Sequence, residues 1–233
     1  LELILHPMAE DAKEATGSMG DDTPLAVLSD KYRPLYHFFR QNFSQVTNPP
    51  IDSLRENKVM SLKTRFGNLG NILNFDNLTK DNIYVLNSPI LSNSQLKKFI
   101  NYFGKNSYEI DCTFEKSENL EIALERIQKE AEIEVRKGVK QLILSDKNIS
   151  EKRLPIPMLL SVGAINSYLI NNKLRGYVSI NVQTGEALDT HSFATLLGVG
   201  ATTVNPYLAL DCLYQRFEKK LFGNFEYEDC IKR

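Results

Sequence analysis

Residues 119–146 read NLEIALERIQKEAEIEVRKGVKQLILSD, a helix pattern followed at once by a strand pattern. Apolar residues recur every three or four positions over Asn119–Lys137, which predicts an amphipathic helix that ends at Gly138. The apolar run Val139–Leu144 then predicts a buried strand that leads into Asp146. A helix joined so closely to a strand is typical of a β–α–β unit.

The same alternation continues on both sides of that stretch. Further strands are expected at 83–86, 108–114, 177–182 and 201–205, and further helices at 92–103, 155–170, 189–197 and 206–222. Repeated strand–helix units with apolar strands form a parallel sheet that helices cover. The fold class is therefore α/β with five strand–helix units, either an open doubly wound sheet or part of a (β/α)8 barrel.

The beginning of the chain lacks this regular alternation of strand and helix patterns. Residues 1–75 are irregular and rich in turn residues, and one helix is expected there, from about Asp30 to Phe43. The string Val46–Asp52 follows and contains two prolines in succession, which exclude helical backbone before them and make a stiff, extended loop. We therefore divide the chain into a connecting segment, residues 1–75, and an α/β domain, residues 76–233.

The composition excludes several classes of protein. Apolar residues make up 42% and charged residues 24%, with a formal net charge of −1, which is typical of a globular domain and gives no strong attraction to nucleic acid or to an anionic membrane. The cysteines Cys112, Cys212 and Cys230 are too widely spaced for a disulfide framework or a metal site. We expect no metal in this chain and a reducing compartment.

Polar residues follow the expected strands at their carboxyl ends, where parallel α/β folds bind ligands. Asp146 ends one strand, Glu186 and His191 follow the next, and Asn205 ends the last. One interpretation is an active site with Glu186 and His191 as acid–base candidates, in a free-standing small enzyme or a binding module. The other is that Asn205 and Asp189 cap helices and that the remaining side chains belong to solvated loops.

The pair of glycines in Gly198-Val199-Gly200 resembles part of a phosphate-binding loop but has the wrong context. Phosphate loops place their glycines after a strand and at the start of a helix. Here the glycines follow an expected helix and precede an expected strand. We interpret them as the turn that ends the helix.

Several strings occur in an order that resembles one known family. The longest are MGDDTPLAVLS at residues 19–29 and QVTNPPID at residues 45–52. Shorter ones are LHPMA at 5–9, LILSD at 142–146 and VNPYLA at 204–209. In these strings the chain resembles the central domain of glutamate synthase, in its large or ferredoxin-dependent subunit, over nearly its whole length. Because the chain begins at Leu1 rather than Met, we take it as an excised domain.

The resemblance implies a role within a larger oxidoreductase. In that family an amidotransferase domain hydrolyses glutamine, and ammonia passes through a tunnel to an FMN-binding barrel, where it adds to 2-oxoglutarate and reduction gives glutamate. The central domain joins the two and is related to the flavin barrel, which implies a rudimentary, incomplete (β/α) barrel here. FMN and an iron–sulfur cluster would be bound elsewhere in the parent enzyme, so this chain is expected to bind no cofactor and to be non-catalytic alone.

The resemblance also assigns contact residues. The tunnel-lining residues would be Val46, Thr47, Asn48, Pro49 and Pro50, and the contacts near the flavin domain would be Ser18, Met19, Asp21 and Asp22. The expected partners are the amidotransferase and FMN-binding domains of the same polypeptide, and neither nucleic acid nor a membrane. The expected location is the cytoplasm, or the plastid stroma if the parent is organellar.

Overall fold

The computed structural model describes residues 2–14, 30, 33–39, 53–67 and 83–233. The chain divides into two compact units, a larger one of Leu1–Gln41 with Ile90–Arg233 and a smaller one of Asn42–Pro89. The expected domain boundary after residue 75 lies outside the described residues and stays a prediction.

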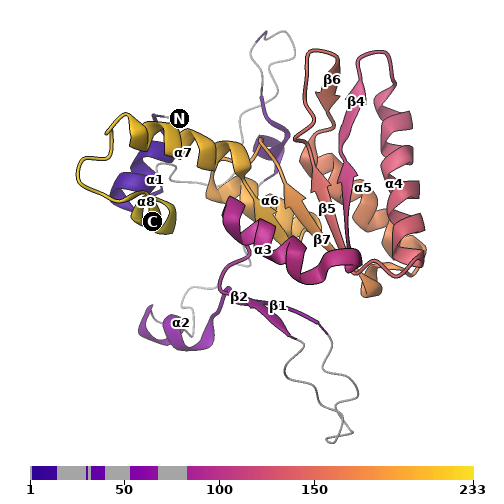
Figure 1. Ribbon diagram of the computed structural model, residues 1–233, viewed down its shortest axis with the longest axis horizontal. Coiled ribbons are helices and arrows are strands. Elements are labelled where there is room, and N and C mark those ends of the chain that lie inside the picture. Colours follow the sequence, from indigo (N-terminus) through magenta and orange to yellow (C-terminus); the bar gives the residue numbers. More distant parts are fainter. Residues whose placement is uncertain (1, 15–29, 31–32, 40–52, 68–82) are drawn as a thin grey trace, which may run out of the picture. The chain divides into compact units, whose positions relative to one another are not determined.

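A four-stranded parallel sheet forms the centre of the larger unit, in the order β3-β5-β7-β8 (Figure 1). Its strands are β3 (Ser107–Asp111), β5 (Gln141–Ser145), β7 (Ser179–Gln183) and β8 (Thr203–Asn205). A parallel bridge from Ile90 to Val204 adds a short edge beyond β8. The α/β class is confirmed, and in the described part of the chain the sheet is open rather than closed into a barrel.

Three helices cover one face of this sheet and enclose the main core. They are α4 (Leu120–Arg136), α5 (Met158–Asn171) and α6 (Thr190–Val199), each of which connects two neighbouring parallel strands. Because right-handed crossovers all turn the same way along this strand order, the helices lie on the same side. Ile127 on α4, Leu144 on β5, Ile165 on α5 and Val182 on β7 are completely buried together in this core.

A second, smaller core lies where the two ends of the chain meet. Helices α1 (Leu5–Asp11), α7 (Tyr207–Glu218) and α8 (Tyr227–Lys232) pack against one another beside both termini (Figure 1). Leu5, Ala9, Leu213 and Phe222 are buried between them. This cluster ties the beginning of the described chain to its end.

Local sequence signals set most of the helix boundaries. Ser92 and Gln95 form a reciprocal capping box at the start of α3 (Asn93–Phe103), which ends at Gly104 before the short 3-10 helix η4 (Gly104–Asn106). Asn119 caps α4 through its side chain, and Gly138 has the positive φ, 99°, that the expected stop requires. These helices were therefore correctly predicted, as was the turn at Gly200.

The expected strand over 108–114 is interrupted. Cys112 separates β3 from β4 (Thr113–Glu115), which pairs antiparallel with β6 (Arg153–Pro155) in a separate two-stranded sheet. The Cys112 N–H donates to the Ser145 carbonyl while its own carbonyl accepts from Ile156 N–H, so the chain changes partners at this residue. The helix expected from residue 155 accordingly begins later, at Met158.

One expected helix is wrong, and one expected strand forms but belongs to a different sheet. The expected helix over Asp30–Phe43 is, in its described part, a single 3-10 turn, η1 (Leu35–Phe38), flanked by extended backbone at Pro34 and Phe39. The expected strand at 83–86 is β2 (Tyr84–Leu86), which pairs antiparallel with β1 (Thr64–Phe66) in the smaller unit. In the sequence, the helix α2 (Ser53–Val59) precedes β1. Among the described residues the parallel sheet therefore has four strands rather than five, because a short apolar run does not specify its partner.

Candidate functional site

Asp146 follows β5 at the carboxyl edge of the sheet and is fully buried. Its Oδ2 accepts a hydrogen bond of 2.5 Å from Thr184 Oγ1, and the Gly185 N–H lies 3.1 Å from both carboxylate oxygens. Burial raises the pKa of this carboxyl, and the hydrogen bonds from Thr184 and Gly185 oppose the rise. The side chain therefore holds the loop after β7 against the end of β5.

Glu186 lies on the loop between β7 and α6. Its Oε2 accepts from the Tyr36 hydroxyl at 3.2 Å and from the Met158 N–H, at the start of α5, at 3.1 Å. Burial raises the pKa of Glu186, and the nearby charge of Asp146 raises it further, against the opposing bond from Met158. The amino end of a helix is a favourable place for such a carboxylate.

His191 occupies the first turn of α6 and is 7% exposed. Its Nε2 lies 2.7 Å from the backbone carbonyl oxygen of Tyr36. A carbonyl oxygen only accepts hydrogen bonds, so Nε2 carries a proton and donates it. Glu186 and His191 thus come together as the sequence suggested, but the group that both of them bind is Tyr36.

Asn205 ends β8 and is also completely buried. Its Nδ2 donates to the Leu91 carbonyl at 2.8 Å and to Asn93 Oδ1 at 3.0 Å, and its Oδ1 accepts from Gln183 Nε2 at 3.2 Å. The amide therefore binds the chain entering α3 to the edge of the sheet. Asn205 does not cap α7 as one interpretation expected, whereas Asp189 does cap α6, where its Oδ1 accepts from the Ser192 N–H.

The face of the sheet opposite the main core carries a polar network that sequence analysis missed. Asn181 Nδ2 donates to Gln141 Oε1 at 3.0 Å, and Asn181 Oδ1 accepts from Thr203 Oγ1 at 2.7 Å. Two residues along, Ser145 Oγ donates to Gln183 Oε1 at 3.1 Å. The strict alternation of polar and apolar residues over Ser179–Gln183 was the available signal, since alternate side chains point to opposite faces.

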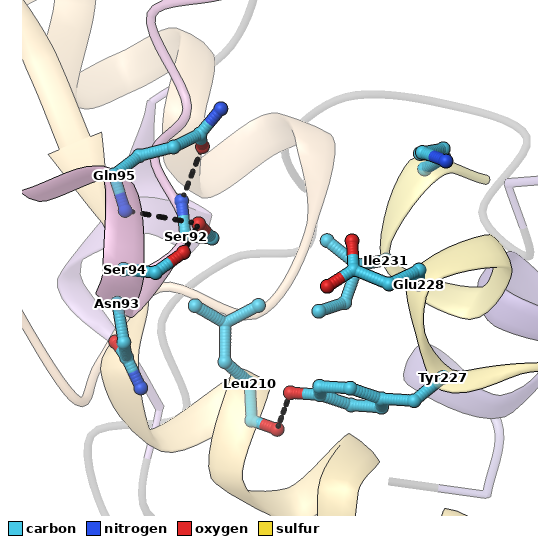
Figure 2. A pocket seen from close by; sticks show the side chains of 9 residues that line it. Ser92, Asn93, Ser94, Gln95, Leu210, Tyr227, Glu228 and Ile231 are labelled. Carbon is cyan, nitrogen blue, oxygen red and sulfur yellow. Dashed lines mark hydrogen bonds between the residues drawn. The ribbon is translucent and has the colours of Figure 1, made fainter.

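A groove of about 420 Å³ lies elsewhere on the larger unit, between the starts of α3 and α8 (Figure 2). The Ser92 and Gln95 side chains that line it are bonded to each other's backbone N–H in the capping box. On the other wall the Tyr227 hydroxyl donates to the Leu210 carbonyl. The capping box thus stabilises the start of α3, and the Tyr227–Leu210 bond joins α8 to α7.

The remaining sequence candidates are the implied tunnel and contact residues and the cysteines. The implied tunnel and contact residues lie outside the described residues; they are Val46, Thr47, Asn48, Pro49, Pro50, Ser18, Met19, Asp21 and Asp22. Cys112 is buried in the main core, where burial raises its pKa, and Cys230 is buried in the second core. Among the described residues, no three His, Cys, Asp or Glu side chains gather into a possible metal site.

Comparison with known proteins shows which family the chain belongs to. A family model described as the glutamate synthase central domain matches residues 1–232. The chain belongs to that family. It is 55% identical over 231 residues to the glutamate synthase (NADPH) large chain of Azospirillum brasilense, covering 98% of this chain and 15% of that protein.

More distant members of the glutamate synthase family show the same relationship. Identity is 41% over 237 residues with the glutamate synthase (NADPH) large chain of Bacillus subtilis, covering 100% of this chain and 15% of that protein. Identity is 40% over 227 residues with the chloroplastic ferredoxin-dependent glutamate synthase of Spinacia oleracea, covering 94% of this chain and 14% of that protein. The chain thus corresponds to about one seventh of the length of these relatives.

Within the part of the chain that the structure describes, no helix is both long enough and apolar enough to cross a membrane.

Proposed function

We propose that this chain is the non-catalytic central domain of a glutamate synthase. In this role it links the glutamine amidotransferase and FMN-binding domains of one polypeptide and contributes to the ammonia tunnel used for glutamate synthesis. The observation that carries the proposal is that the candidate side chains Asp146, Glu186, His191 and Asn205 are all hydrogen-bonded within the domain itself.

An acid or base must reach its substrate within about 3 Å, directly or through one water. Asp146 and Asn205 are 0% exposed, and His191 points its protonated nitrogen at a backbone carbonyl. Glu186 already accepts two hydrogen bonds from its own chain. These arrangements support structural roles for all four and disfavour a free-standing enzyme at this edge of the sheet.

The proposed tunnel contribution depends on the sequence string at residues 45–52. Two consecutive prolines stiffen it, and a stiff loop can hold a narrow bore without an ordering cost in each turnover. Thr47 and Asn48 would offer hydrogen bonds to passing ammonia. Ser18, Met19, Asp21 and Asp22 would lie near the flavin domain, where Met19 would be an adaptable apolar contact.

We further propose that FMN and the iron–sulfur cluster of the parent enzyme are bound outside this chain. Two of the three cysteines, Cys112 and Cys230, lie in separate cores, which supports their roles as packed thiols rather than joint ligands. The cytoplasm, or the plastid stroma, is the proposed location, since one relative is named as chloroplastic.

The test is the coupling of glutamine hydrolysis to glutamate formation in the full-length enzyme. A Thr47→Phe substitution should obstruct the tunnel and raise the amount of glutamine consumed per glutamate formed at least about twofold. The control, Asn101→Phe, places the same ring on an exposed position of α3 and should leave the ratio unchanged. An unchanged ratio in Thr47→Phe would contradict the tunnel role.

A further inference from the structure

A tyrosine of the chain itself fills the place where parallel α/β folds ordinarily bind a ligand. That place is formed by the carboxyl ends of the strands and the amino ends of the helices that follow them. Here Tyr36 is hydrogen-bonded both to Glu186, in the β7–α6 loop, and to His191, in the first turn of α6. It is only 3% exposed, and its ring belongs to the main core.

Tyr36 comes from outside the strand–helix units that form this edge of the sheet. It lies on η1, 150 residues before Glu186 and well before the first parallel strand, β3. Its neighbour Leu35 is half-buried against the main core, and the three residues that follow, 37–39, are exposed. The ring of Tyr36 therefore enters the site from a segment that lies mostly on the surface, as a bound ligand would.

Two groups of the site match two groups of this tyrosine. Glu186 Oε2 accepts from the Tyr36 hydroxyl at 3.2 Å, and His191 Nε2 donates to the Tyr36 carbonyl oxygen at 2.7 Å. The Met158 N–H, at the start of α5, donates to the same oxygen of Glu186 at 3.1 Å and so holds the carboxylate in place. An aromatic ring with a hydroxyl at its far end satisfies the carboxylate, whereas a plain ring would leave it without that donor.

We infer that Tyr36 is an internal ligand, which closes a binding site for a small phenol at the carboxyl edge of the sheet. The core side chains around the ring supply the apolar part of this site. Glu186 supplies the acceptor that distinguishes a phenol from a plain aromatic ring. The inference concerns this edge alone and does not depend on the proposed tunnel.

The test empties the site with Tyr36→Ala, which removes the phenol group and keeps the backbone carbonyl that His191 binds. Phenol at about 10 mM should bind the purified variant with a Kd of about 1 mM and raise its Tm by about 3 °C. Benzene should bind at least about fivefold more weakly, because it cannot donate to Glu186. Titrations followed by NMR give both affinities. Equal affinities, or tighter binding of benzene, would overturn the inference.

Three further proteins serve as controls. The wild type and Tyr36→Phe should bind neither compound, because a ring still fills the site. Phenol binding by the wild type as tight as that by Tyr36→Ala would place the site elsewhere and overturn the inference. Phe99→Ala removes a completely buried ring that has no hydroxyl, on α3, so benzene should bind there at least as tightly as phenol. A preference for phenol in that cavity as well would also overturn the inference.

A double variant identifies the acceptor. When Glu186→Met is added to Tyr36→Ala, the ratio of phenol affinity to benzene affinity should fall at least about tenfold. An unchanged ratio would overturn the role of Glu186.

The same two compounds decide the question if Tyr36→Ala does not fold by itself. Each is then added during refolding of the variant. Recovery of a cooperative unfolding transition with phenol but not with benzene would support the inference. Recovery with neither compound, or equally with both, would overturn it.

Discussion

Thr184 Oγ1 donates a 2.5 Å hydrogen bond to the fully buried carboxylate of Asp146, which lies 38 residues earlier in the chain. The bond joins the loop after β7 to the end of β5. Thr184 Oγ1 also accepts from the Glu186 N–H at 3.1 Å, so one hydroxyl orders the loop that presents Glu186 to Tyr36. The acidic groups at this edge are thus components of the scaffold.

Thr184→Val should destabilise the fold although it preserves the shape of the side chain. The substitution removes the hydrogen bond from the Thr184 hydroxyl to the Asp146 carboxylate, to which the Gly185 N–H still donates, and the loss of a hydrogen bond to a buried charged group costs about 1.5–3 kcal/mol. Urea unfolding of the purified chain measures the change. Thr190→Val, at the start of α6, is the control, and a loss of stability equal to that of the control would contradict the structural role of the Thr184 hydroxyl.

Glu186→Gln should change how stability depends on pH. The pKa of Glu186 is raised from its ordinary value of 4.5, so the folded state holds this proton to higher pH than the unfolded chain does. The free energy of unfolding therefore falls as pH rises through and above that value. The amide can still accept from Tyr36 and Met158, but it does not titrate.

The free energy of unfolding of Glu186→Gln should consequently decline less than that of the wild type between about pH 4 and pH 7. Urea titrations across this range give the two curves. Glu125→Gln, at an exposed position on α4, should follow the wild type. Parallel curves for Glu186→Gln and the wild type would show that the carboxyl titrates alike in the folded and unfolded states.

Gly200→Ala should be strongly destabilising, by about 2–4 kcal/mol. Gly200 has φ of 127°, and a Cβ there would lie 2.5 Å from Asn166 Cγ. Arg175 bonds both Asn166 Oδ1 and the Gly200 carbonyl, so Asn166 is held in place. By contrast, a Cβ added at Gly198, inside α6, would meet no atom within 4 Å. Gly198→Ala should therefore raise the free energy of unfolding by up to about 1 kcal/mol. Thermal unfolding of both variants checks the difference in sign.

Asn181→Leu tests whether the polar face of the sheet is necessary. The substitution removes the hydrogen-bond partner of the buried Gln141 amide and Thr203 hydroxyl. We therefore expect the free energy of unfolding to fall by about 2–4 kcal/mol. Ser179→Ala, at the half-buried start of the same strand, should change stability by less than about 0.5 kcal/mol. Equal stabilities of Asn181→Leu and the wild type in urea would show that apolar packing can replace the network.

The features that the sequence predicted are those with a local cause. Asn119, the apolar stripe of α4 and Gly138 form a complete set of start, face and stop signals within one stretch. The strand β5 follows directly and is buried along its whole length. The α/β class could be derived from such units, because each one carries its own pattern.

The features that the sequence did not predict depend on distant partners. Tyr36 is hydrogen-bonded to Glu186 and His191, which lie 150 and 155 residues away, and this contact outweighs the helical spacing of Leu35 and Phe39. The partner of β2 could not be read from its short apolar run. At the candidate site, residue types and strand ends located Glu186 and His191 correctly, but only the structure shows that their partner is Tyr36.

The central claim is that the strand-end polar groups of this chain are structural. Its most direct test is one titration of the purified, cooperatively folded chain with FMN, and one assay with glutamine, 2-oxoglutarate, reduced FMN and ammonia. We expect no saturable flavin binding and no glutamate formation. Saturable FMN binding, or glutamate formation that Glu186→Gln abolishes, would show that this edge of the sheet is an active site and would contradict the claim.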